Sequence, residues 1–501
     1  MIKQLLLDLY IIYALCINGA KQSEVTPKSV GIMLALDILI PRSFCISNKQ
    51  LTEFNTMDEK ARNELPAIIA KIREAGITAA ANMTVTEQQN STVGESSIKG
   101  PMWVSKFYLS APENDIVQEL TLRVIDELGN PIKTNTQPAS VGIDVEWVGY
   151  RSNVDSNTPE PPISEIEKYH NLMEEAKNTG VVMYVYGGAF YLNTPARYRK
   201  ITARLSKMTG LPCMMVRQRL APQHPFPAAL IDVFHGYMSL LSPHPSAPNS
   251  AIPGSSIVLA GDSSGANLAL GLLQILLTLR RKGISSLEYH GRKVTLELPA
   301  GLTLLSAVGE LTNTLPSYKH NASHDVFPRD LTPTVLPGFP VCAIWPSKPP
   351  RGNIYCEGPV LAHPIASPAC AEDWTGSPFM WFCSGQEQIV DGAKVIAKNA
   401  FGQGVQVVFR EYEGMPHTFM WHLPGAPQSE HCWKAWAETC RSIIMGTTGS
   451  TSEKVFIDHQ GMEAHDENLT QLISLTREEA SEIIKQGAKR YKPFTGKYSS
   501  L

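Results

Sequence analysis

The feature that most constrains the fold is a regular alternation of short apolar runs and helix-like stretches between residues 103 and 445. Runs with the length and composition of strands fall at residues 103–109, 143–148, 181–186, 214–217, 257–260, 301–305, 379–383 and 405–409. Helical patterns separate most of the later runs, among them 197–209, 228–241, 266–282 and 391–402. This alternation predicts an α/β protein in which helices cover both faces of a central, mostly parallel sheet of about eight strands.

The composition is typical of a large globular protein and excludes several other classes. The chain has 501 residues, of which 43% are hydrophobic, so it can bury a sizeable core in one large domain or in two. Its 44 Lys and Arg residues against 47 Asp and Glu residues give a formal charge of −3, which leaves no basic field for nucleic acid. The nine cysteines lack the spacing of a zinc site or of a disulfide framework. We expect neither a nucleic-acid partner nor a bound metal.

The N-terminal segment is apolar but does not match a standard targeting signal. Residues 5–17 are interrupted by Asp8, and no good cleavage site follows them. An amphipathic helix that packs on the domain or lies on a membrane surface is therefore favoured over a secretory signal or an anchor. Residues 30–40 predict a second helix of the same kind. We accordingly expect a cytoplasmic or membrane-associated protein rather than a secreted one.

The segments that flank the alternating region carry no chemical motif. Residues 48–95 are polar and helix-like, and the Ser/Thr/Gln-rich stretch 84–97 predicts a loop or linker. Near the other end, residues 472–489 have helical spacing and predict a peripheral helix. The expected organisation is an N-terminal helical region (1–100), an α/β domain (101–445) and a C-terminal peripheral extension (446–501).

The first chemical motif is Gly261-Asp262-Ser263-Ser264-Gly265, between a predicted strand and a predicted helix. The two glycines allow a turn too sharp for a β-carbon, and the strained corner lifts the Ser263 hydroxyl clear of the sheet. Backbone N–H groups at the following helix start point at developing negative charge. This G-x-S-x-G pattern in a strand–turn–helix context predicts Ser263 as a nucleophile.

Paired glycines follow the strand predicted at 181–186, in the sequence Tyr-Gly-Gly-Ala-Phe. Backbone amides at such a turn are not obstructed by side chains and can bind the oxyanion of an acyl transfer. A Gly-Gly pair by itself indicates only a turn, but its position ahead of the serine motif favours the functional interpretation. The predicted donors are the N–H groups of Gly187, Gly188 and Ser264.

A general base and an acid are expected on the loops after the last two predicted strands. His417 follows the later strand, on a loop with a glycine and a proline, where an imidazole can reach the serine from the carboxyl edge of the sheet. Two carboxylates, Glu387 and Asp391, follow the earlier strand. Glu387 lies nearer the strand end, whereas Asp391 suits the start of the next helix. Glu387 is therefore favoured, and Asp391 is the alternative.

Three segments together resemble the hormone-sensitive-lipase-like branch of the α/β-hydrolases. Residues 261–269, Gly-Asp-Ser-Ser-Gly-Ala-Asn-Leu-Ala, are similar to the nucleophile segment of that branch. Residues 219–229, Arg-Leu-Ala-Pro-Gln-His-Pro-Phe-Pro-Ala-Ala, are similar to its most recognisable non-catalytic stretch. Residues 414–417 are similar to its histidine loop, and the serine, acid and histidine follow one another in the α/β-hydrolase order. The resemblance spans residues 100–445.

Two details qualify this resemblance. Tyr186 stands where the branch usually has the histidine of a His-Gly-Gly-Gly motif, a change that keeps the amide donors but alters a side chain supporting the loop. The stretch 345–352, Trp-Pro-Ser-Lys-Pro-Pro-Arg-Gly, and the use of Glu387 as the acid are similar to fungal members of the branch.

The resemblance implies an ester hydrolase that works through an acyl-enzyme, without a metal or an organic cofactor. In such an enzyme Ser263 attacks the ester carbonyl, His417 removes its proton and Glu387 orients the imidazole. The implied partner is a small-molecule ester, apolar or of medium size. Residues 1–100 and the Pro-rich segment 315–364 are candidates for the helical cap of the family. The candidate pocket residues are Phe190, Tyr191, Trp345 and Met415.

Two other classes of function remain open. An acyltransferase or cyclase of secondary metabolism uses the same acyl-enzyme with an acceptor other than water, and the sequence does not distinguish the acceptors. A non-hydrolytic ligand-binding protein on the same scaffold usually loses the serine or the histidine. Because Ser263 and His417 are both present, the ligand-binding class is disfavoured.

Overall fold

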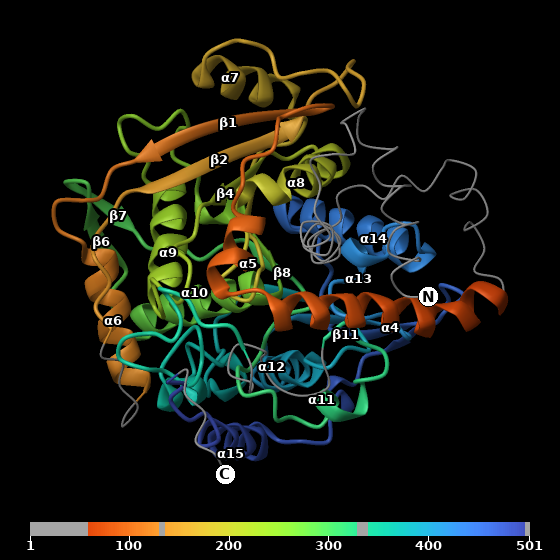
Figure 1. The fold of residues 1–501 in the computed structure, drawn as a ribbon. Helices are drawn as coiled ribbons and strands as arrows, with labels where there is room; N and C mark the ends of the chain where they lie inside the picture. Colours follow the sequence, from red (N-terminus) through yellow and green to blue (C-terminus); the bar gives the residue numbers. More distant parts are fainter. Residues whose placement is uncertain (1–58, 130–135, 328–338, 496–501) are drawn as a thin grey trace, which may run out of the picture.

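The computed structural model describes residues 59–129, 136–327 and 339–495. The helices predicted at 5–17 and 30–40 lie outside these ranges. A ten-stranded sheet forms the centre of the described part, in the order β1-β2-β4-β3-β5-β8-β9-β10-β11-β12. Strands β1 and β2 lie side by side at one edge of this sheet (Figure 1). Its strands are β1 (Met102–Leu109), β2 (Ile143–Tyr150), β3 (Val181–Val185), β4 (Cys213–Val216), β5 (Ile257–Asp262), β8 (Gly301–Leu305), β9 (Phe379–Gly385), β10 (Val407–Tyr412), β11 (Glu453–Ile457) and β12 (Glu463–Asp466).

The middle of this sheet is parallel. Strands β4, β3, β5, β8, β9, β10 and β11 run parallel to their neighbours, whereas β1 and β2 at one edge and β12 at the other pair antiparallel. A separate antiparallel hairpin joins β6 (Ser286–Tyr289) and β7 (Arg292–Thr295), which the sequence analysis did not predict. The carboxyl ends of the parallel strands meet at one edge, where loops from β3, β5, β9 and β10 can converge.

Helices cover both faces of the sheet. The α-helices in the described ranges are α4 (Glu59–Asn82), α5 (Val85–Thr92), α6 (Ile116–Leu128), α7 (Glu165–Glu175), α8 (Pro195–Thr209), α9 (Ala228–Leu241), α10 (Ser263–Arg281), α11 (Ser317–His320), α12 (Val390–Gly402), α13 (Phe419–His422), α14 (Pro427–Met445) and α15 (Arg477–Ala488). Alternate side chains of β3 enter different cores: Met183 joins a cluster with α9, α10 and α12, and Tyr184 joins one with α8 and α14. The runs predicted as strands from residue 103 to residue 409 therefore form the central layer of a three-layer α/β structure.

The structure adds two strands beyond the last predicted one. The helix predicted at 472–489 is present as α15, but two strands that were not predicted precede it: β11 pairs in parallel with β10, and β12 pairs with β11. Only Val455 and Ile457 of β11 are buried, so the apolar pattern is too short to indicate a strand without its neighbour. The helix predicted at 472–489 begins later, at Arg477, because Thr476 and Glu479 form a capping box there.

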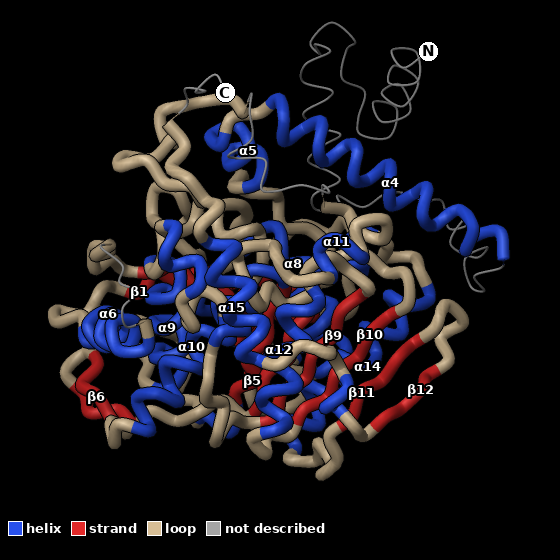
Figure 2. The backbone as a smooth tube through the Cα atoms, turned by 90° about the horizontal axis from the view of Figure 1, so that it is seen from below, coloured by secondary structure: helices blue, strands red, loops and turns tan. Residues whose placement is uncertain are grey.

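The prediction of a loop at 84–97 is wrong for residues 85–92, which form α5. The Thr84 side chain accepts a hydrogen bond from the Glu87 N–H while Glu87 bonds back to the Thr84 N–H, which caps the helix. The longer helix α4 precedes it and lies on the same side of the molecule as α11 (Figure 2). Within the described ranges, no helix combines the length and the apolar character needed to cross a membrane.

Candidate active site

The serine sits at a strained corner between β5 and α10. Ser263 has a φ of 51°, in the left-handed region that non-glycine residues rarely adopt. A β-carbon on Gly265 would lie 2.0 Å from the carbonyl oxygen of Val185 in β3, so only glycine fits at this contact. The close approach of helix and strand fixes the corner, and the Ser263 side chain stands at the carboxyl end of the sheet.

Three side chains predicted from separate segments form one hydrogen-bonded chain at this edge. His417 Nε2 lies 2.9 Å from Ser263 Oγ, and His417 Nδ1 lies 2.9 Å from Glu387 Oε2. Ser263 retains 8% of its accessible surface, whereas Glu387 is fully buried. A hydroxyl, an imidazole and a carboxylate in this order can transfer a proton from the serine to the histidine.

The loops that carry the acid and the histidine pack directly on each other. A β-carbon on Gly385 would lie 2.0 Å from the carbonyl oxygen of Met415, so a larger residue would separate the two loops. Thr418, directly after the histidine, has a φ of 45°. This tight backbone contact sets the distance between the Glu387 carboxylate and the His417 imidazole.

The competing carboxylate, Asp391, has a different partner. Its Oδ2 accepts a hydrogen bond from the Ser317 N–H at 2.8 Å, and it makes no contact with His417. Asp391 lies in the first turn of α12, whereas Glu387 lies in the loop before that helix. Of the two carboxylates that the sequence left in competition, the structure brings Glu387 to the histidine.

The electrostatics of the site favour a protonated histidine. Burial opposes a charge on His417, but the negative charges of Glu387, Asp325 and Asp262 outweigh it, so the pKa of His417 is raised above its usual value. Burial in turn raises the pKa of Asp262, although hydrogen bonds from Tyr184 and the Gly187 amide oppose the rise. The imidazolium that forms when His417 accepts a proton is thus stabilised by surrounding carboxylates.

The oxyanion donors differ from those predicted. The Gly187 N–H donates to Asp262 Oδ1 at 3.0 Å, so the prediction that it faces an oxyanion is wrong. Gly188 follows with a φ of 134°, and a β-carbon there would lie 2.4 Å from the Leu192 carbonyl oxygen. Within the described part of the chain, the amides of Gly188, Ala189 and Ser264 have no hydrogen-bond acceptor. These three amides are free to bind an anion, and Ala189 replaces Gly187 in the set.

The tyrosine that replaces the usual histidine before this loop is firmly held. The Tyr186 hydroxyl accepts a hydrogen bond from the Gln218 N–H at 3.0 Å, and its ring stacks on Tyr198 with 5.3 Å between centroids. Gln218 Nε2 also donates to the Tyr186 carbonyl oxygen at 3.2 Å. A buried tyrosine and a glutamine thus support the loop.

Two residues next to the histidine were not predicted from the sequence. The carboxylate of Asp325 accepts a hydrogen bond from the His417 N–H at 2.9 Å. The ring of Phe327 lies over the imidazole, with 4.6 Å between centroids. Both come from a loop without a strand or a recognisable motif, so no periodicity or spacing signal pointed to them.

The four predicted pocket residues do not form one pocket. Trp345 and Met415 are fully buried and belong to two different hydrophobic clusters, so their prediction as pocket lining is wrong. Phe190 is buried and stacks on Tyr355, with 3.8 Å between centroids. Tyr191 is half-buried, and its hydroxyl donates to Gln88 of α5 at 2.8 Å. Phe190 and Tyr191 thus support the oxyanion loop.

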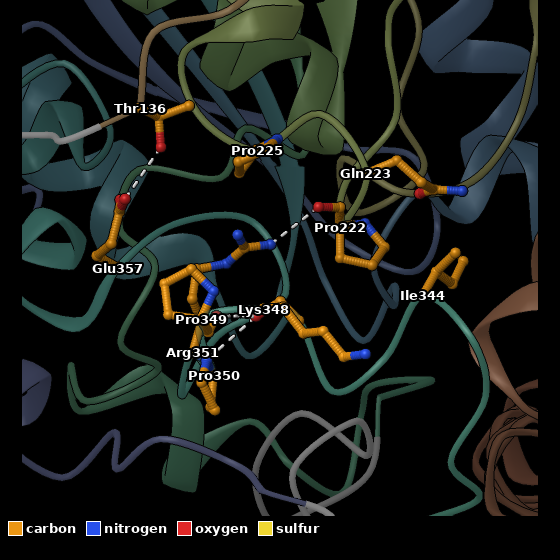
Figure 3. A pocket seen from close by; sticks show the side chains of 11 residues that line it. Thr136, Pro222, Gln223, Pro225, Ile344, Lys348, Pro349, Pro350, Arg351 and Glu357 are labelled. Atoms are coloured by element: carbon orange, nitrogen blue, oxygen red, sulfur yellow. Dashed lines mark hydrogen bonds between the residues drawn. The ribbon is translucent and has the colours of Figure 1, made fainter.

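A cavity of about 460 Å³ lies elsewhere, between the segments 222–225 and 347–351 (Figure 3). Arg351 spans these segments by donating to the Pro222 carbonyl oxygen at 3.0 Å. Neither the three hydrogen-bonded side chains of the site nor the four predicted pocket residues line this cavity. It is therefore separate from the immediate surroundings of Ser263.

Comparisons with known proteins agree with this geometry. Residues 182–421 match the model of a family described as alpha/beta hydrolase fold. The chain is 25% identical over 327 residues to an acetyl-hydrolase of Streptomyces hygroscopicus, covering 64% of this chain and 93% of that one. It is 27% identical over 271 residues to an esterase of Acinetobacter venetianus, covering 54% and 77%. A shorter match, 32% identical over 92 residues, joins 18% of this chain to 12% of the hormone-sensitive lipase of Bos taurus.

A solved structure shows the same fold. The crystal structure of a mutant esterase superposes with a TM-score of 0.50 and 21% identity, covering 77% of this chain and 100% of that one. The chain therefore has the α/β-hydrolase fold, and the matches support the hormone-sensitive-lipase-like branch of that family. It is a serine carboxylic-ester hydrolase, the class that its relatives and its fold define.

Proposed function

We propose that the protein hydrolyses an apolar or medium-sized ester through an acyl-enzyme on Ser263. The observation that carries this proposal is the chain of contacts from the Ser263 hydroxyl through the His417 imidazole to Glu387, each 2.9 Å long. The serine oxygen bonds to the ester carbonyl carbon while His417 takes its proton, and Glu387 holds the imidazole with Nδ1 protonated. His417 then gives the proton to the departing alcohol.

The negative oxygen that forms in this step is assigned to the free amides of the oxyanion loop. Gly188, Ala189 and Ser264 supply these N–H groups from two elements that approach each other at the serine corner. Rigid amide donors act without reorganisation when the charge develops. Water, activated by His417, then attacks the acyl-serine ester, which releases the acid and restores the hydroxyl.

The preference for an apolar ester rests on the surroundings of the serine. The aromatic ring of Phe327 covers the imidazole, and Ser263 has little exposed surface. An apolar acyl chain loses less hydration than a charged one when it enters such a site.

The test is hydrolysis of p-nitrophenyl esters from acetate to laurate by the wild type and by Ser263→Ala. We expect turnover by the wild type, loss of turnover in the variant, and labelling of Ser263 by a fluorophosphonate. Label at Ser263 with transfer to an added alcohol but no release of acid would favour an acyltransferase. Absence of both turnover and label would favour a ligand-binding protein and overturn the proposal.

Finer proposals rest on the sequence alone. These are the similarity to fungal members of the branch, suggested by residues 345–352, and the division into regions 1–100, 101–445 and 446–501. Contact of the N-terminal segment with a membrane surface is a further proposal of this kind. Binding of the full chain to vesicles, compared with that of a chain lacking residues 1–58, tests the membrane contact.

A further inference from the structure

The carboxylate of Asp325 contacts the backbone of two loops of the site, the one that carries Glu387 and the one that carries His417. Its side chain is fully buried. Oδ1 accepts a hydrogen bond from the His417 N–H at 2.9 Å, and Oδ2 accepts one from the Gln388 N–H at 2.6 Å. Because Gln388 directly follows Glu387, one carboxylate joins the backbone of the acid loop to that of the histidine loop.

Asp325 is held in this position by its own segment. The side chain of Asn321 donates to the Glu387 carbonyl oxygen at 3.0 Å, and the Val326 N–H donates to Asp325 Oδ1 at 2.7 Å. From the other side, Arg73 of α4 donates to the Asp325 carbonyl oxygen at 3.0 Å. The carboxylate is therefore a fixed part of the site.

A buried carboxylate is a costly way to join two backbone amides. Removing a charge from water carries a large penalty unless hydrogen bonds and a nearby opposite charge compensate for it. The two amides supply the hydrogen bonds here, and the imidazole of His417 supplies the opposite charge once it accepts a proton. A neutral asparagine offers only one acceptor oxygen for the two amides and no charge.

We infer that Asp325 is a positioning residue for ester hydrolysis: its carboxylate fixes the Glu387 and His417 loops to each other and adds a negative charge beside the imidazole to those of Glu387 and Asp262. The inference rests on the proposed function of the Ser263 site. Asp325 reaches the reacting atoms only through His417 and the backbone, so it orients the machinery and takes no part in bond formation.

This role has a signature in pH dependence. In the described part of the chain, the charged groups that face His417 are Glu387 on the loop after β9, Asp262 at the end of β5, and Asp325, while Phe327 covers the ring. The α4 residue Arg73 binds the backbone of Asp325 and does not contact the imidazole. Removing the charge of Asp325 lowers the pKa of His417, so the pH at which activity rises on the acidic side moves down.

The experiment compares Asp325→Asn with Asp391→Asn in the full chain. Asp391 is a matched control, because its carboxylate is also buried and also accepts a hydrogen bond from a backbone amide, that of Ser317. It makes no hydrogen bond to His417. For Asp325→Asn we expect kcat for p-nitrophenyl butyrate to fall on the order of 10²-fold with KM little changed. We also expect the acidic limb of the pH profile, meaning the rise of kcat/KM with pH on the acidic side, to shift to lower pH by roughly 0.5–1 unit. Asp391→Asn leaves the limb in place.

An unmoved limb in Asp325→Asn, or an equal shift in both variants, would overturn the inference. Asp325→Glu restores the charge and serves as a control for poor folding. In this variant, the pH at which kcat/KM rises on the acidic side should return toward the wild-type value. Titration of His417 by NMR on histidine-labelled protein gives the same shift without any turnover. If the wild type has no esterase activity but the pKa of His417 still differs between wild type and Asp325→Asn, only the proposed function is contradicted. If the wild type is active but the pKa of His417 is the same in both proteins, the role of Asp325 is contradicted.

Discussion

The loops that form the catalytic floor and the segments that cover them are held by different forces. The floor, meaning the loops that carry Ser263, Glu387 and His417, is set by backbone contacts that exclude even a β-carbon at Gly265 and Gly385. The cover, meaning α4 and α5, is attached in part by hydrogen bonds from polar side chains to carbonyl oxygens, beside a few buried apolar side chains such as Val85. Each such bond contributes only about 1 kcal/mol. The position of the chemical groups thus depends on rigid sterics, and the attachment of the cover depends on several weak contacts.

The largest effect is expected from removing the nucleophile from the floor. Ser263→Ala should lower kcat for p-nitrophenyl esters on the order of 10⁴-fold or more, because it removes the hydroxyl that lies 2.9 Å from His417 Nε2. The melting temperature should stay close to that of the wild type, since the residue keeps its small size. Residual hydrolysis within about 10-fold of the wild type would show that the nucleophile lies elsewhere.

A second large effect distinguishes the two carboxylates after β9. Glu387→Gln should lower kcat by roughly 10³-fold to 10⁴-fold, because the imidazole loses the acceptor that fixes its tautomer. Asp391→Asn, whose carboxylate accepts a hydrogen bond from the Ser317 amide, should lose far less. Steady-state kinetics on both variants test this contrast, and equal losses would contradict the assignment of Glu387.

The steric argument for the floor is tested by adding one carbon. Gly265→Ala places a β-carbon 2.0 Å from the Val185 carbonyl oxygen, so it should cost about 3 kcal/mol or more of unfolding free energy and misplace Ser263. Gly402→Ala is the matched control, because nothing lies within 4 Å of its β-carbon. It should be neutral or stabilising by less than about 1 kcal/mol. Urea unfolding of both variants gives the comparison, and equal stability would refute the argument.

The pH dependence of the wild type follows from the charges around the histidine. Because the pKa of His417 is raised by Glu387, Asp325 and Asp262 against the effect of burial, the imidazole stays protonated to a higher pH than usual. Protonated His417 cannot take the serine proton, so kcat/KM should fall as the pH drops, with a midpoint above about 6.5. A profile of kcat/KM from pH 5 to pH 9 measures this midpoint. A value well below 6.5 would mean that burial dominates.

The smallest effect is expected in the cover. Gln89 of α5 donates to the carbonyl oxygens of Tyr191 and Ala221 at 3.0 and 2.8 Å, so Gln89→Ala should cost about 1–3 kcal/mol and loosen the oxyanion loop. We expect kcat to fall less than about 10-fold. Gln486→Ala on the exposed face of α15 is a control that touches neither loop. A loss as large as that of Glu387→Gln would show that floor and cover are not distinct.

The floor was largely predictable from the sequence, whereas the cover was not. Strands β3, β5, β9 and β10 have strong apolar patterns, and the residues after them were predicted as the chemical ones; the structure brings Ser263, Glu387 and His417 into contact. Helix α5 has a polar sequence and docks through Gln88 and Gln89, so periodicity gave no signal for it. The short strand β11 pairs in parallel with β10 and buries only two side chains, so its own sequence gave little signal.

The sequence by itself determined the layered α/β architecture and the three segments that meet at one sheet edge, since hydrophobic period and strand-end motifs are local properties. Only the tertiary structure decided that the Gly187 amide is bound by Asp262 and that the carboxylate of Asp325 joins two loops. These decisions depend on which donor lies within about 3 Å of which acceptor. That distance is set by packing between segments far apart in the chain, and no local pattern encodes it.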